Sequence, residues 1–234
     1  RLFTISGFVP GAVIGLAYFV GFTGIWLVLA MFYQRGLGFS PLRSGLAVSP
    51  VALGVATSAA LAGRLVDRAG RWLTVTGLLA TIGGLAVTAF LLADATAATA
   101  WRASIPLAVA GLGGGMVTSP NITLSLQNVP VAMAGAAGGA LQTAQRIGSA
   151  VGTAVLATIF YSLLNRSGDD YSSSIRTTIL AAAGIMLVAL LLAAADLLRN
   201  RRPAPPRIRV ERPEHEGSPP CADAPAGVVT HPRP

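Results

Sequence analysis

Six long apolar stretches occupy most of this 234-residue chain, and they constrain its fold more than any other feature. Each stretch is long enough to cross about 30 Å of hydrocarbon as a helix. Because 53% of the residues are hydrophobic and only 11% are charged, the composition lies outside the range of soluble domains. The sequence predicts an all-α integral membrane protein, a bundle of six transmembrane helices. The expected spans are 8–32, 42–63, 73–93, 104–126, 135–164 and 177–198.

Short connections rich in turn formers and charges separate these spans, so consecutive helices are expected to be antiparallel neighbours. Arginines near the span ends predict the orientation, because the cytoplasmic loops of membrane proteins carry an excess of basic residues. The excess here favours a multi-pass protein whose C-terminal tail is cytoplasmic. The inner arginines are Arg1, Arg64, Arg68, Arg71, Arg199, Arg201 and Arg202, against Arg35, Arg43, Arg102, Arg166 and Arg176 outside.

The net charge of +8 lies between and after the apolar stretches, and nucleic acid is therefore not expected as a partner. Residues 199–234 are rich in arginine and proline, which predicts a disordered cytoplasmic tail. The tail is interpreted as a topology anchor, or alternatively as a segment that binds anionic lipid headgroups. It also holds Cys221, His215 and His231, too few ligands for a metal site. The absence of an initiator methionine at Arg1 predicts that the chain is a fragment.

Glycines at four-residue spacing predict close packing between the helices, because small residues let helix backbones approach one another in a membrane. Static packing and a role in rocking motions both remain open for them. The fifth stretch holds two such pairs and is therefore expected to lie inside the bundle. The pairs are Gly11 with Gly15, Gly111 with Gly115, Gly135 with Gly139, and Gly148 with Gly152.

Among the charged residues, Arg146 lies deepest within an apolar stretch. It is expected to face the bundle interior or a wet cavity, with Gln142 one turn before it and Asn121 contributing a further polar group. A purely structural role for Arg146 is the alternative.

Tyr18, Phe22 and Trp26 recur every four residues in the first stretch and form an aromatic stripe. They are interpreted as a lining for flat apolar cargo, with lipid contact or plain helix packing as the alternative.

No acid lies in the middle of a span, so this chain alone does not provide the deep carboxylate that a transmembrane proton relay requires. The membrane part has neither a histidine nor a pair of acids, and no enzymatic activity, metal or other cofactor is expected.

The segment between the second and third spans resembles the loop motif of the major facilitator superfamily, Gly-x-Leu-x-Asp-Arg-x-Gly-Arg. Further matches, such as Arg146-Ile147-Gly148, are similar to the fourteen-helix drug:proton antiporters of the EmrB/QacA-like branch. Trp72 departs from the motif, which often has a second basic residue at that position. The motif is matched by Gly63, Leu65, Asp67, Arg68, Gly70 and Arg71, with Arg64 between the first two.

This resemblance implies the C-terminal half of an efflux permease in a bacterial plasma membrane, the inner membrane of the cell. The missing N-terminal half would be its main partner, and the substrates would be protons and small amphipathic or cationic compounds, antibiotics included. The loop motif would act in gating, with Asp67 capping the third span or pairing with Arg68 or Arg71.

Two other functions remain open. An importer of a different solute shares the same loop motif, although it would be expected to carry more polar side chains inside the bundle. A membrane scaffold without transport activity would depend instead on the arginine-rich tail.

Overall fold

A computed structural model describes residues 4–5, 7–93, 96–168 and 170–199, and these residues contain helices and turns but no strand. The all-α fold predicted from the sequence is thus confirmed. The elements are α1 (Phe8–Met31), the π-helical turn η2 (Phe32–Gly36), α2 (Pro41–Ala69), α3 (Arg71–Leu91), α4 (Ala97–Arg102), α5 (Ser104–Leu126), the 3₁₀ turn η3 (Val131–Met133), α6 (Ala134–Arg166) and α7 (Tyr171–Arg199).

Within the described residues, five helical segments have the length and apolar composition needed to cross a membrane, namely Phe8–Gly36, Pro41–Ala69, Arg71–Leu91, Val131–Arg166 and Tyr171–Arg199. The sixth expected span corresponds to α5, whose 23 residues include several glycines and polar groups and which is not among the five. Because α5 contacts α2, α3 and α1, much of its surface faces protein and requires less apolar character than a lipid-facing helix.

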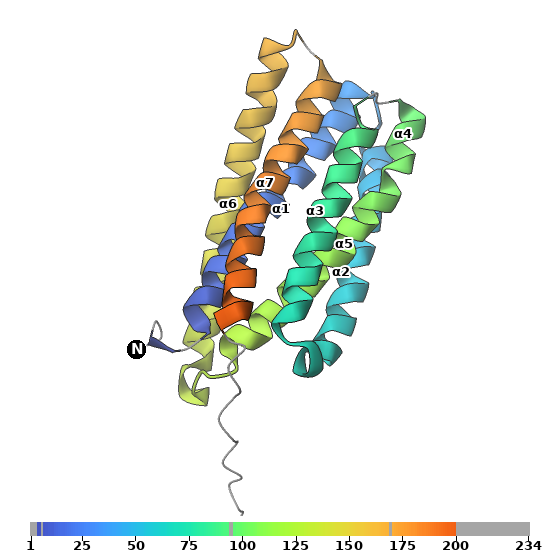
Figure 1. The fold of residues 1–234 in the computed structure, drawn as a ribbon. Coiled ribbons are helices and arrows are strands. Elements are labelled where there is room, and N and C mark those ends of the chain that lie inside the picture. Colours follow the sequence, from blue (N-terminus) through green and yellow to red (C-terminus); the bar gives the residue numbers. More distant parts are fainter. Residues whose placement is uncertain (1–3, 6, 94–95, 169, 200–234) are drawn as a thin grey trace, which may run out of the picture. The chain divides into compact units, whose positions relative to one another are not determined.

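The long helices form two groups of three that run side by side (Figure 1). In one group α5 packs between α2 and α3, and in the other α1 packs between α6 and α7. Contacts of α3 with α7 and of α1 with α5 join the two groups. Helices that are distant in sequence thus become neighbours, which brings the start of α3 close to the end of α7.

Three consecutive glycines in α5 explain how this helix fits among three neighbours. Successive residues of a helix point about 100° apart, so Gly113, Gly114 and Gly115 face different helices. A side chain on the first would collide with α3, one on the second with the Tyr18 hydroxyl of α1, and one on the third with α2 at Val55. Glycine at all three positions therefore permits close contact on three sides.

Three of the four predicted glycine pairs lie at helix contacts. Gly11 and Gly15 of α1 face Ser125 and Asn121 of α5. Gly111 and Gly115 face the backbone of α2, and Gly148 and Gly152 face the backbone of α1. The packing expected at Gly135 and Gly139 is not found, because a side chain at either position would meet no described group within 4 Å. The first turns of α6 present this face to no other described helix.

The connection between the second and third spans differs most from its prediction. Residues 64–72 were expected to form a loop, yet α2 continues through Ala69 and α3 begins at Arg71. Gly70 alone makes the turn, with a φ of 51° that favours glycine. The intervening arginines, leucine and alanine are good helix formers, and no helix-breaking residue interrupts them before Gly70.

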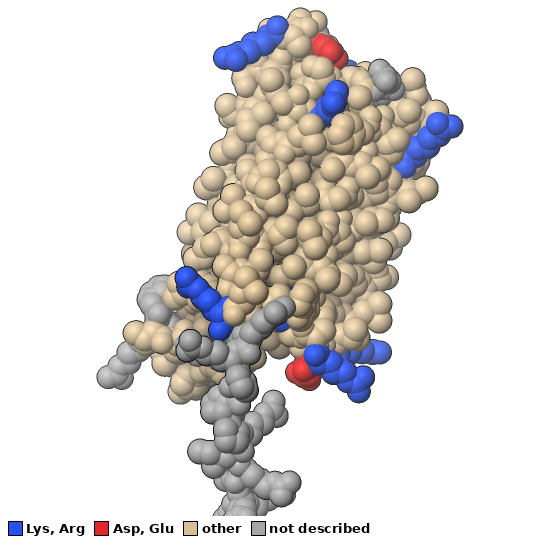
Figure 2. Space-filling model, in the orientation of Figure 1, with Lys and Arg blue, Asp and Glu red and all other residues tan. Residues whose placement is uncertain are grey.

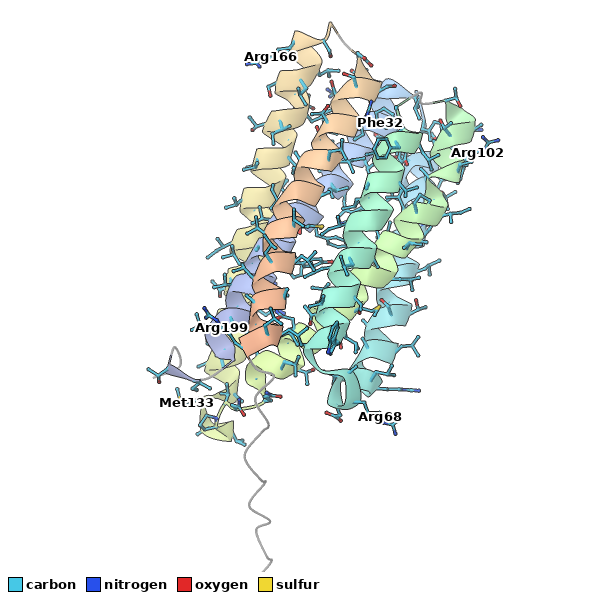
Figure 3. All side chains as sticks on the ribbon, viewed as in Figure 1. Phe32, Arg68, Arg102, Met133, Arg166 and Arg199 are labelled. Carbon is cyan, nitrogen blue, oxygen red and sulfur yellow. The ribbon has the colours of Figure 1, made fainter. Side chains whose placement is uncertain are left out.

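Charged side chains gather toward the two ends of the helices on the face shown in Figure 2, with a broad uncharged band between them. Arg68 and Arg199 lie at one end, whereas Arg102 and Arg166 lie at the other (Figure 3). This division agrees with the inner and outer groups assigned from the sequence.

Several of the predicted features lie outside the described residues. Among them are the tail after Arg199, with Cys221, His215 and His231, and three of the inner arginines, Arg1, Arg201 and Arg202.

Candidate functional site

A buried ion pair lies at the end of the bundle where Gly70 makes the turn. The Nε atom of Arg71, the first residue of α3, is 2.6 Å from Oδ2 of Asp196, which lies in the last turn of α7. Both side chains are less than one-tenth exposed. A pair at this depth fixes the start of one span against the end of another, because separating the two charges in a low dielectric is costly.

Asn121 extends this pair to two further helices. Its Oδ1 accepts a hydrogen bond from Nη1 of Arg71 at 3.0 Å, and its Nδ2 donates to the carbonyl of Gly11 at 2.9 Å. Asn121 belongs to α5 and Gly11 to α1, so the cluster of Arg71, Asp196, Asn121 and Gly11 joins α3, α7, α5 and α1. We call these four residues the inner cluster.

The helix dipoles explain why these charges favour each other. Arg71 lies at the positive N-terminal end of its own helix, and Asp196 lies near the negative C-terminal end of its helix, so each opposes its own helix dipole. In the inner cluster, however, each charge adjoins the complementary end of the other helix. Losing one partner would leave the other unfavourably placed.

The remaining motif residues occupy the surface near the turn. Gly63, Arg64, Leu65, Asp67 and Arg68 are exposed along the last turns of α2. The predicted role of Asp67 as a cap or partner is wrong for this conformation. No side chain caps α3, and Arg71 pairs with Asp196 instead.

Sequence reasoning missed Asp196 as a site residue. Its position two residues before the end of the expected span 177–198 assigned it to the membrane surface. One signal was available, because Asp196 is the only acid in the helix Tyr171–Arg199. An isolated acid at the end of an apolar helix indicates a basic partner at the same membrane face.

A second feature is an apolar groove of about 630 Å³ between α1 and α2. Phe22 and Trp26 line it from α1, and Gln34 contributes a polar group from η2. The α2 side consists of proline, glycine, alanine, valine and serine residues, and none of the lining residues carries a charge. An uncharged groove with an aromatic wall suits an apolar, flat molecule.

Tyr18, the third member of the aromatic stripe, lies beside this groove without lining it. Its ring stacks on Phe22, with the ring centres 5.0 Å apart, and is almost fully buried. Phe22 in turn meets Trp26 edge to face at 4.9 Å. Tyr18 therefore holds the wall of the groove in place.

The polar residues expected inside the bundle are distributed differently. Asn121 is buried in the inner cluster and does not line the groove. Gln142 and Arg146 are exposed on α6, so neither faces the interior of this bundle, and the alternative that they face a wet cavity stays a prediction. The neighbouring Gln145 is the buried polar residue of that helix, because Gln145 and Gly148 lie on the face that meets α1.

Among the described residues, no group of three or more histidine, cysteine, aspartate or glutamate side chains could hold a metal ion.

Residues 2–153 match the family model described as "Major Facilitator Superfamily". The relatives include a "Probable actinorhodin transporter" of Streptomyces coelicolor, 36% identical over 76% of this chain and 32% of its own length. A "Tetracycline resistance determinant" of Streptomyces rimosus is 35% identical over 64% of this chain and 43% of its length. The "Puromycin resistance protein pur8" of Streptomyces alboniger is 34% identical over 63% of this chain and 29% of its length. The chain thus spans less than half the length of these relatives.

Proposed function

Because the chain belongs to the major facilitator superfamily, we propose that it is the C-terminal half of an efflux permease for small amphipathic or cationic compounds. The observation that carries this proposal is its similarity to proteins named for antibiotic resistance or transport. The uncharged groove with its aromatic wall agrees with such cargo. The protein would lie in a bacterial plasma membrane, with the Gly70 turn and the tail on the cytoplasmic side.

Alternating access would require contacts that form in one conformation and break in another. The inner cluster has the properties of such a contact, because it joins four helices at one end of the bundle through an ion pair and two hydrogen bonds. The motif residues Asp67 and Arg68, exposed beside it, would then act on the N-terminal half or in the other conformation. Export would be driven by protons, with the proton-carrying acid in the N-terminal half.

This function is tested with the complete transporter that contains this chain, expressed in a bacterial strain that lacks its major efflux pumps. We expect cells to accumulate less of a fluorescent amphipathic cation, and we expect a protonophore to abolish the difference. Accumulation that is higher than in the empty-vector strain would favour an importer and contradict the proposal.

Replacing Trp26 by alanine should weaken cargo binding, because the groove loses half of its aromatic wall. The loss of one aromatic contact, about 0.5–1.5 kcal/mol, corresponds to roughly a two- to tenfold higher substrate concentration for half-maximal efflux. Trp101 of α4, which does not line the groove, provides the matched Trp101→Ala control. Equal effects of the two substitutions on efflux kinetics would assign cargo binding to a different surface.

A further inference from the structure

Arg146 carries a charge on the outside of a long membrane helix. It lies twelve residues after the start of α6 and twenty before its end, or about 18 Å and 30 Å along the axis. Its side chain is exposed. An arginine at such depth is costly when it faces lipid, and arginines within spans usually pair or face protein.

The described part of the chain offers no carboxylate to Arg146. Its acids are Asp67, Asp170 and Asp196. Asp196 pairs with Arg71, whereas Asp67 lies in the last turn of α2 and Asp170 immediately precedes α7. An opposite charge for Arg146 would therefore have to come from a segment that the structure does not describe.

The surroundings of Arg146 indicate a helix as that segment. Gly135, Gly139, Gln142 and Arg146 follow one another at spacings of four, three and four residues, which places them on one face of α6. All four residues are exposed, and a side chain added at either glycine would meet nothing within 4 Å. Small and polar residues on a membrane helix favour close contact with another helix over contact with lipid.

The position of α6 in the bundle agrees with this assignment. Together with α2, it is the least buried of the candidate spans. The two helices belong to different groups of three, α2 packing on α5 and α6 on α1. The relatives are also two to three times as long as their matched parts, which leaves ample chain for a second bundle.

We propose that a transmembrane helix of the N-terminal half packs on the face formed by Gly135, Gly139, Gln142 and Arg146, and that it supplies a carboxylate that pairs with Arg146. This inference rests on the N-terminal half named in the proposed function. It does not depend on the cargo or on the direction of transport.

The sign of a stability change tests the ion pair. In the complete transporter in lipid nanodiscs, Arg146→Leu should lower the melting temperature, because it leaves the partner carboxylate unpaired inside the membrane. Arg146→Lys should restore most of the loss. If Arg146 instead faces lipid, leucine removes a costly charge, and an unchanged or raised melting temperature would overturn the proposal. Arg166→Leu, at the exposed end of α6, is the control and should change little.

A photo-crosslinking residue at Gly139 tests the packing directly. We expect it to yield peptides joined to a span of the N-terminal half, whereas the same residue at Gly184, an open position on α7, should yield none. Crosslinking of position 139 to lipid alone would overturn the proposal. Neither measurement uses transport, so a protein that imports its substrate would refute the proposed function while leaving this interface intact.

Discussion

Replacing Arg71 by leucine will destabilise the bundle by about 3–5 kcal/mol, the range expected when one partner of a buried ion pair is removed. The substitution removes the buried ion pair with Asp196 and the hydrogen bond to Asn121. Because α3 and α7 meet at this point, we expect the loss to appear both in thermal unfolding of the complete transporter and in its efflux rate.

Two further variants distinguish the effect of the ion pair on stability from a general effect of changing the turn. Arg68→Leu changes an exposed arginine of the same hairpin and should alter stability by no more than about 1 kcal/mol. The double variant Arg71→Leu with Asp196→Leu should recover much of the lost stability, since it removes both charges of the buried pair. If Arg71→Leu is no more harmful than Arg68→Leu, the inner cluster does not hold the helices together.

Replacing Gly152 by leucine should separate α1 from α6. A side chain at this position would collide with the backbone of α1 at Val20, and Gly24 of α1 faces Gly152 in the same contact. Overpacking in a core costs about 1–3 kcal/mol, and a rigid backbone on the opposing side places this substitution at the upper end of that range. Thermal unfolding of the transporter in lipid nanodiscs measures the loss.

Gly184→Leu is the matched control, because it makes the same change where a side chain would meet nothing within 4 Å. It should leave stability unchanged or raise it slightly, since leucine favours helix over glycine. Similar melting temperatures for the two variants would contradict the close contact of α1 with α6.

Hydropathy predicted the helical fold and the long helices of the described residues, because each expected span is a run of apolar residues long enough to be recognised without tertiary information. It failed at the connection after Gly63. Arginine and aspartate indicated a loop, yet side chains at a helix end can reach water while the backbone stays helical, so α2 continues to Ala69. Charge alone does not mark the end of a membrane helix.

The candidate site was predicted only in part, for a different physical reason. The motif located Arg71, but its partner Asp196 comes from the other end of the chain, and no local pattern joins them. Periodicity placed Gln142 and Arg146 on one face of a helix, but it could not show which face the bundle covers. In the structure, α1 covers the face that carries Gln145 and Gly148 instead.

The proposed topology is tested most directly by measuring on which side of the membrane the Gly70 turn lies. Single cysteines at Arg68 and at Arg102, which lie at opposite ends of the bundle (Figure 3), would be introduced after Cys221 is replaced by serine. An impermeant maleimide should label Arg102→Cys in intact spheroplasts and should label Arg68→Cys only after the membrane is opened. Labelling of Arg68→Cys in intact spheroplasts would contradict the proposed topology.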